Sequence, residues 1–105
     1  MIYLASPYSG TADERAERYT LAVEFCTRYL TQGIVLFSPI VYGHPFAQTV
    51  GTSAAAWTPF NQQMIDLASE MWVLTLPGWK TSKGVQQEIA TWEFLKARRP
   101  IMKSF

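Results

Sequence analysis

Short apolar runs alternate along the chain with longer stretches in which apolar positions recur every three or four residues. The first three runs are typical of buried strands, because each ends at a serine–proline or proline–glycine pair. The longer stretches are typical of helices with one buried face. The predicted strands are residues 2–5, 34–37, 71–76 and 100–102. The predicted helices are residues 11–32, a stretch that begins at residue 58, and residues 82–97.

Capping signals mark several helix ends. Thr11 and Glu14 have the spacing of a capping box, and Gly33 is placed to end the first helix. Thr58-Pro59 has the pattern of an N-cap followed by proline at the first helical position. Residues 41–56 show no clear period and are interpreted as a long loop with at most a short helical turn. The side chains predicted to face the sheet are Ala16, Tyr19, Val23, Cys26 and Leu30, then Phe60, Met64, Leu67 and Ala68, and finally Val85, Ile89, Trp92 and Ala97.

Alternating strands and helices predict a parallel sheet that is covered on both faces. We therefore expect residues 1–105 to form one α/β domain, a Rossmann-like (flavodoxin-like) three-layer α/β/α sandwich with a parallel sheet of about four strands. Sheets of this kind bind ligands at the carboxyl ends of their strands, near a topological switch point. The loops to inspect are residues 6–10, 38–56 and 77–84.

The composition of the chain excludes several classes of protein and of binding partner. Hydrophobic residues make up 49% of the chain and charged residues 16%, which excludes a disordered or low-complexity protein. A net charge of +1 gives no electrostatic case for a nucleic-acid or membrane partner. Cys26 and His44 are the only cysteine and histidine, so we expect no disulfide, no metal centre and a cytoplasmic location. Aromatic residues, 14% of the chain, favour an aromatic pocket or a subunit interface.

Among the eight acidic residues, Glu88 is placed differently from the rest. It lies early in the last predicted helix, after a loop that begins at the carboxyl end of a strand. Val85 and Ile89 flank it, so part of its face points towards the sheet. A carboxylate beside a ligand crevice suits a nucleophile or a base. The alternative interpretation is an ordinary exposed helix glutamate.

The loop before that helix has features of an anion site. Ser82 and Gly84 lie at the predicted helix start, where free backbone N–H groups favour a phosphate, and Lys80 or Lys83 adds positive charge. A plain helix cap by Ser82 is the alternative. His44 stands in the long predicted loop, as either a substrate contact or an anchor of the loop.

Two stretches resemble the nucleoside 2-deoxyribosyltransferase-like superfamily. They are Ile2-Tyr3-Leu4-Ala5-Ser6-Pro7-Tyr8, similar to its opening strand and loop, and Ser82-Lys83-Gly84-Val85-Gln86-Gln87-Glu88-Ile89, similar to its helix with the catalytic glutamate. The motifs Phe37-Ser38-Pro39, His44-Pro45, Trp57 and Leu76-Pro77-Gly78-Trp79 add a likeness to a small family of short bacterial and phage proteins within it. The resemblance covers nearly the whole chain.

The resemblance implies cleavage of an N-glycosidic bond, with Glu88 as the nucleophile and Tyr3 beside it. Ser82 stands where transferases acting on free nucleosides usually carry aspartate, and where relatives that hydrolyse 2′-deoxynucleoside 5′-monophosphates carry serine. A serine suits a phosphate that an aspartate would repel. The residues expected to bind substrate are Ser6, Pro7, Tyr8, Ser9, Gly10, His44, Asn61, Trp79, Ser82 and Gly84.

One position departs from the superfamily. Asn61 or Gln62 stands where an aspartate usually contacts the sugar or assists the base, and Asp66 follows one turn later. An amide can form hydrogen bonds but cannot act as a general base.

The sequence therefore predicts an N-glycoside hydrolase for a (deoxy)nucleoside 5′-monophosphate or a related nucleotide, without a cofactor. A deoxyribosyltransferase and a non-catalytic nucleotide-binding module remain alternatives. The only partners expected are the small-molecule nucleotide or nucleoside and, as in the superfamily, further copies of the chain in a homo-oligomer.

Overall fold

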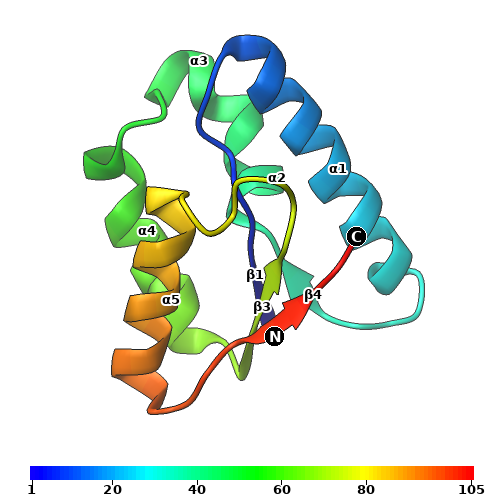
Figure 1. Ribbon diagram of the computed structural model, residues 1–105, viewed down its shortest axis with the longest axis vertical. Coiled ribbons are helices and arrows are strands. Elements are labelled where there is room, and N and C mark those ends of the chain that lie inside the picture. The colour runs from blue at the N-terminus through cyan, green and yellow to red at the C-terminus, as the bar shows by residue number, and fades with distance from the viewer.

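A computed structural model describes all of residues 1–105 and shows four parallel strands with the helices that connect them (Figure 1). The elements in chain order are β1 (Ile2–Ala5), α1 (Ala12–Leu30), β2 (Leu36–Phe37), α2 (Pro39–Gly43), the 3-10 helix η1 (His44–Phe46), α3 (Ala47–Val50), α4 (Ala54–Leu67), β3 (Glu70–Leu74), α5 (Lys83–Lys96) and β4 (Ile101–Lys103). The predicted fold class, a single Rossmann-like domain with a four-stranded parallel sheet, is confirmed.

The strands lie in the order β2-β1-β3-β4. In the register, Tyr3 of β1 lies opposite Phe37 of β2 on one side and Met71 of β3 on the other. The chain first moves from β1 outwards to β2 and then returns past β1 to β3. The order of the strands thus reverses between β1 and β3, which makes their carboxyl ends the switch point where such sheets bind ligands.

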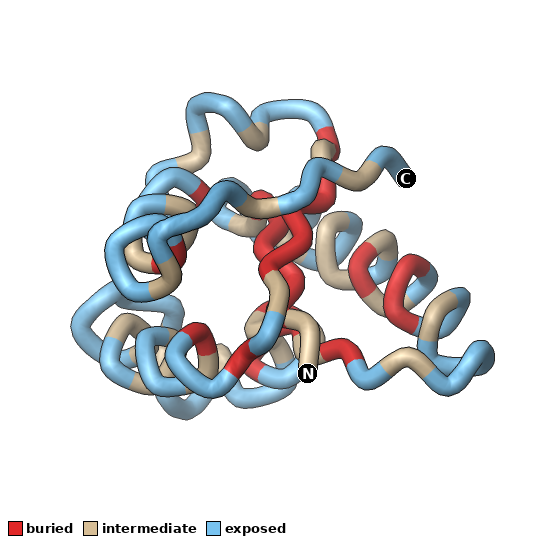
Figure 2. Tube along the Cα trace, turned by 90° about the horizontal axis from the view of Figure 1, so that it is seen from below, coloured by how far each residue is buried: buried red, intermediate tan, exposed pale blue.

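Successive side chains of the strands point to opposite faces of the sheet and pack into two separate cores, one on each face. Tyr3, Met71 and Val73 pack on the face covered by α4 and α5, together with Ile65 and Trp92 from those helices. The opposite face is covered by α1, and its core is made of Leu4, Phe25, Cys26, Leu36, Trp72, Leu74 and Leu76. Figure 2 shows the buried strands between these two helical layers.

The inward face of α1 differs from the prediction. The capping box of Thr11 and Glu14 is present, and Cys26 is buried, but Ala16 and Leu30 are exposed. Ala22 and Phe25 face the sheet instead. A helix of this length is about 28 Å long, whereas a five-residue strand spans about 17 Å, so only the middle of α1 can cover the sheet.

Three further expectations about helices are wrong. Residues 41–56 are mostly helical, because they contain most of α2, all of η1 and α3, and the start of α4. α4 begins at Ala54, where the Ser53 hydroxyl accepts a hydrogen bond from the Ala56 N–H, so Pro59 lies inside the helix rather than at its start. At the end of α5, Ala97 adopts a left-handed conformation with φ of 54° and is exposed, because it terminates the helix.

Strands β1, β3 and β4 lie within two residues of their predicted bounds, whereas β2 covers only the second half of its predicted run, and Leu67, predicted to face the sheet, is 72% exposed at the end of α4. Ser82 caps α5, and Val85 and Trp92 are buried on the sheet as expected. Neither α1 nor any other helix combines the length and apolar character that crossing a membrane requires.

Candidate functional site

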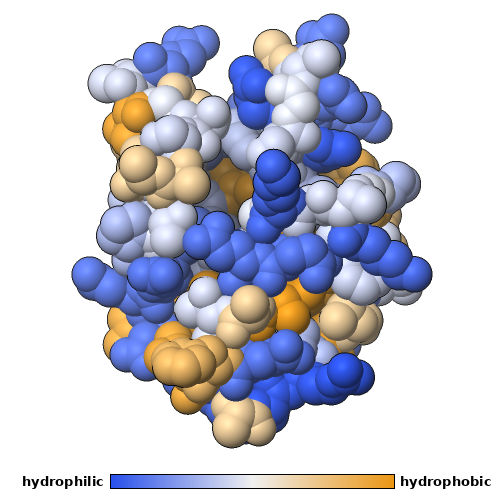
Figure 3. All heavy atoms as spheres, turned by 60° about the vertical axis from the view of Figure 1, so that its left-hand side comes forward, coloured by the Kyte–Doolittle hydropathy of each residue, from blue (hydrophilic) through white to orange (hydrophobic).

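The candidate site lies at the carboxyl ends of β1 and β3, the switch point of the sheet. The loop after β1 and the start of α5 meet there, with α2, η1, α3 and α4 on the remaining side (Figure 1). They enclose a cavity of about 280 Å³, the size of a small-molecule site. Figure 3 views the α4–α5 side of the molecule and shows the surface hollowed between two projections at its top.

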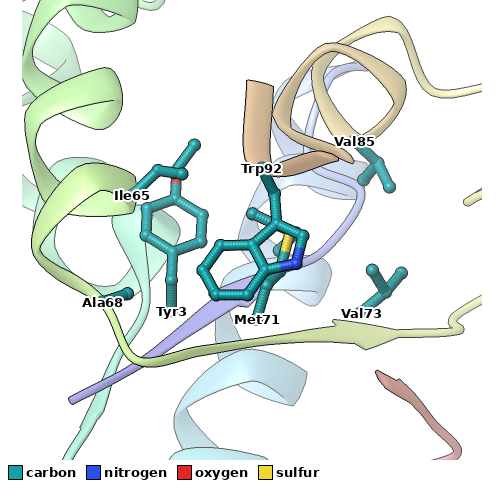
Figure 4. Close-up of a cluster of buried hydrophobic side chains, with 8 residues drawn as sticks. Tyr3, Ile65, Ala68, Met71, Val73, Val85 and Trp92 are labelled. Atoms are coloured by element: carbon teal, nitrogen blue, oxygen red, sulfur yellow. The ribbon is translucent and has the colours of Figure 1, made fainter. Parts of the chain in front are cut away.

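Tyr3 and Glu88 form a hydrogen-bonded pair in which Glu88 lines the cavity and Tyr3 reaches it from the core and does not line the cavity itself. The Tyr3 ring is fully buried in the core between the sheet and α4–α5, and Figure 4 shows it standing beside Ile65 with its hydroxyl directed away from the strand. That hydroxyl donates to the Glu88 carboxylate, whose residue lines the cavity. The sequence placed both residues in the catalytic centre, and the structure brings them into direct contact across 85 positions of the chain.

Burial changes the acid–base properties of the pair. Desolvation raises the pKa of Glu88 to about 7, and the hydrogen bond from Tyr3 acts against this rise. The pKa of Tyr3 is raised first by its burial and then by the nearby carboxylate, so Tyr3 keeps its proton. Glu88 is therefore close to half ionised at neutral pH, and it is a base or nucleophile whose charge Tyr3 supports.

Two polar groups of the cavity have no partner in the protein. They are the Ser6 hydroxyl and the Asn61 side-chain oxygen, and both atoms are buried without a hydrogen bond. Ser6 as a whole is only 4% exposed. Ser6 follows β1 directly, and Asn61 projects from the middle of α4. Buried polar atoms are nearly always paired in folded proteins, so both groups are placed to bind a ligand.

His44 lies in the same cavity and is held on two sides. Its Nδ1 is 2.7 Å from the Tyr8 hydroxyl, and its ring stacks on Tyr19 with 4.3 Å between centroids. Tyr19 reaches it from α1, so His44 joins α1 and the β1 loop to η1. His44 is thus anchored, as one sequence interpretation predicts, and it also lines the cavity, whereas the substrate contact stays a prediction.

The first turn of α5 contributes its N-terminal end to the site. The Ser82 hydroxyl accepts the Val85 N–H at 3.3 Å, and Ser82 and Gly84 both line the cavity. A second hollow of about 300 Å³ adjoins it and shares Tyr8, Ser9, Ser82 and Lys83 with it. This second hollow also contains the guanidinium-bearing Arg18, which donates to the Ser9 carbonyl.

Glu88 is the only carboxylate that lines either space, and Arg18 and Lys83 add positive charge. The sequence carries no signal that points to Arg18, since a charged residue on a long surface helix normally faces solvent. Only the fold brings it to the β1 loop. The other sequence-predicted cation, Lys80, lies over the Trp79 ring instead.

Several predicted site residues lie elsewhere. Trp79 packs against the α4–α5 core and does not line the cavity, whereas Trp57 lines it and donates to the Gly51 carbonyl at 2.7 Å. Pro7 borders the second hollow only.

Gly10 touches neither space, and its φ of 154° belongs to the turn that starts α1. Asp66, a possible substitute for the missing acid, is exposed and does not line the cavity. Asn61 and Gln62 both do line it. No group of three or more histidine, cysteine or acidic residues gathers where it could hold a metal ion.

The fold and the site together define a Rossmann-like α/β protein with a ligand-sized cavity and, at its switch point, a half-buried glutamate hydrogen-bonded to a buried tyrosine. Within this class, the chain belongs to the family described as a domain of unknown function (DUF1937), whose model matches residues 1–103. No curated protein matches the chain significantly.

Proposed function

We propose that this protein hydrolyses the N-glycosidic bond of a (deoxy)nucleoside 5′-monophosphate or a related nucleotide. The observation that carries the proposal is Glu88, which lines a cavity of about 280 Å³ and accepts a hydrogen bond from the buried Tyr3 hydroxyl. A carboxylate in that setting is matched to attack an anomeric carbon near neutral pH. The resemblance to the nucleoside 2-deoxyribosyltransferase-like superfamily assigns the same two residues to this chemistry.

The proposed reaction follows the two-step course of retaining glycosidases. The Glu88 carboxylate attacks the anomeric carbon, the base departs with the electron pair of the glycosidic bond, and a glycosyl ester forms on Glu88. Water then attacks the same carbon and releases the sugar phosphate and the free carboxylate. Tyr3 supports the negative charge on Glu88 at the beginning and the end of this cycle.

The start of α5 is suited to the 5′-phosphate. Backbone N–H groups at the N-terminal end of a helix bind anions, and Ser82, Lys83 and Gly84 all line the cavity at that end. Glu88 lies on the same helix between one and two turns further on, which leaves room for a pentose between the phosphate and the carboxylate. A phosphate there distinguishes a nucleotide from a free nucleoside.

Base release is the direct test. The protein is incubated with ribo- and deoxynucleoside 5′-monophosphates, including modified pyrimidines, and free base is followed by chromatography. We expect release that Glu88→Gln lowers by at least about a thousandfold, because the nucleophile is lost. Glu93→Gln is the matched control, since Glu93 is an exposed glutamate on the same helix.

The same assay separates the alternatives. A second free base in excess would be converted to a new nucleotide if the protein is a deoxyribosyltransferase. Nucleotide binding that survives Glu88→Gln, without turnover by the parent protein, would identify a binding module and overturn the proposed hydrolysis. Activity that Glu88→Gln and Glu93→Gln leave equal would overturn the site.

The homo-oligomer expected from the superfamily stays a prediction. Large apolar side chains are available for it at the surface, with Val35 66%, Leu67 72% and Phe94 87% exposed. Sedimentation equilibrium of the purified protein tests it.

A further inference from the structure

We infer that His44 is the general acid that protonates the departing nucleobase, an inference that rests on the proposed hydrolysis. A base that leaves an anomeric carbon takes the electron pair of the glycosidic bond with it. Unless the base receives a proton, it carries away a negative charge, and proton transfer in such steps is worth about 10²- to 10⁴-fold in rate. The position at which the superfamily usually supplies an aspartate holds Asn61 or Gln62, and neither amide can transfer a proton.

The cavity offers few other sources of that proton. The titratable side chains that line it are Glu88, Tyr8, His44 and Lys83. Glu88 is the nucleophile and must be ionised when it attacks. Lys83 lies at the start of α5, the end suited to the phosphate. An imidazolium can give up a proton from either ring nitrogen, which leaves His44 as the group matched to the task.

Contacts around His44 fix the ring and leave one nitrogen for the ligand. The Tyr8 hydroxyl lies 2.7 Å from Nδ1, and Tyr19 stacks on the ring face at an angle of 23°. Nε2 has no partner from the protein's side chains, so it is the nitrogen available to a ligand. A ring held in this way points a single N–H at a bound base without having to be ordered first.

His44 also belongs to the wall that a base would reach. A phosphate at the start of α5 and a sugar at Glu88 leave the side formed by η1 and α4 for the base. Trp57 of α4 lies there, so close to Gly43 that an added Cβ on this glycine would be 3.3 Å from the tryptophan ring. Gly43 therefore lets the Trp57 ring pack against the residue that precedes His44, and both Trp57 and His44 line the cavity.

The proton balance closes over the two steps. In the first, a carboxylate oxygen of Glu88 forms a bond to the anomeric carbon and the glycosidic bond breaks. The Nε2 proton of the His44 imidazolium passes to the base, and the remaining Nδ1–H donates to the Tyr8 oxygen. In the second, water attacks the anomeric carbon, Glu88 leaves as a carboxylate, and the proton lost by the water returns to Nε2.

A comparison of leaving groups tests this role. The substrates are the nucleotide cleaved best in the base-release assay and the 4-nitrophenyl glycoside of the same sugar 5-phosphate, whose nitrophenolate departs without a proton. For His44→Gln we expect kcat/KM to fall by at least about 100-fold with the nucleotide and by less than about tenfold with the aryl glycoside. Glu88→Gln is expected to abolish both reactions.

Tyr8→Phe provides a second, milder variant. It removes the partner of Nδ1 but keeps the ring, so a smaller loss confined to the nucleotide is expected. Equal losses with the two substrates in His44→Gln, or full activity of that variant with the nucleotide, would overturn the inference while the hydrolase stands. A parent protein that cleaves neither substrate would instead overturn the proposed function itself.

Discussion

The Tyr3–Glu88 pair joins a buried hydroxyl to a half-buried carboxylate, and the fold changes the protonation of that carboxylate. The hydroxyl donor and burial act on Glu88 in opposite directions, and burial is the larger effect, which leaves its pKa near 7. A group whose pKa is raised on folding binds extra protons in the folded state. The free energy of unfolding therefore falls as pH rises through the interval between the pKa in the unfolded chain and that in the fold.

For Glu88 this interval runs from 4.5 to about 7. Glu88→Gln cannot ionise, so we expect the variant to gain stability over the parent protein as pH rises, reaching about 3 kcal/mol at pH 8 and vanishing near pH 4. Urea unfolding at several pH values measures it. Glu93→Gln should show no such pH-dependent gain, and a constant difference for Glu88→Gln would contradict a titrating carboxylate.

Tyr3→Phe tests the hydrogen bond alone. The hydroxyl stabilises the ionised carboxylate, so its removal raises the pKa of Glu88 further. Since the nucleophile must be ionised, we expect the acid limb of the kcat/KM profile for base release to move to higher pH. An acid limb that stays in place or moves to lower pH would mean that Tyr3 does not set the charge of Glu88.

At the scale of the elements, α4 contains a local conflict between a proline in its interior and the hydrogen bonds of a regular helix. Pro59 stands at the sixth position of the helix, where its nitrogen cannot donate to the Ala55 carbonyl. Thr58-Pro59 by itself has the pattern of a helix start, whereas the Ser53 cap and the alanines that follow extend the helix one and a half turns upstream. That extension places Trp57 on the cavity.

Pro59→Ala should relieve this conflict. We expect the substitution to raise the free energy of unfolding by about 1–3 kcal/mol, because it restores a helical hydrogen bond at an exposed position. Thermal and urea unfolding measure the gain, with Gln63→Ala on the same helix as the control for an alanine at an exposed site. A loss of stability in Pro59→Ala would mean that the proline ring itself supports the packing of α4.

At the scale of the whole molecule, the sheet separates the site from half of the core. Tyr3 and Val85 belong to the cluster beneath α4 and α5, and Phe25 belongs to the cluster beneath α1. The site is built on the first face, so disturbance of the second reaches it only through the strands.

Phe25→Leu and Ile65→Val should therefore behave differently. Both are buried, and each change is expected to cost about 1 kcal/mol of unfolding free energy. We expect Phe25→Leu to keep kcat/KM for base release within about twofold, whereas Ile65→Val, which lines the cavity, lowers it further. The paired assays of unfolding and turnover decide this, and equal losses of activity would mean that the two faces are not independent.

Interactions between near neighbours in the sequence determined where most strands and the starts of α1 and α5 lie. Apolar runs stopped by proline or glycine located the strands, the capping box located the start of α1, and Ser82 located the start of α5. These features act between near neighbours in the chain, so their pattern can be read without the fold. The helices of residues 39–50 escaped detection because they are short and follow no apolar period.

Contacts between distant segments were decided only by the tertiary structure. The sequence alone does not reveal that Tyr8 and Tyr19 hold His44, that Arg18 reaches the β1 loop, or that Trp57 rather than Trp79 lines the cavity. Each depends on how helices are turned and placed on the sheet, which the summed packing of both cores sets. The position of Glu88 near the start of α5 could be predicted from the sequence, because it depends on local signals. Its raised pKa could not, because it arises only from the desolvation that the fold imposes beside Tyr3.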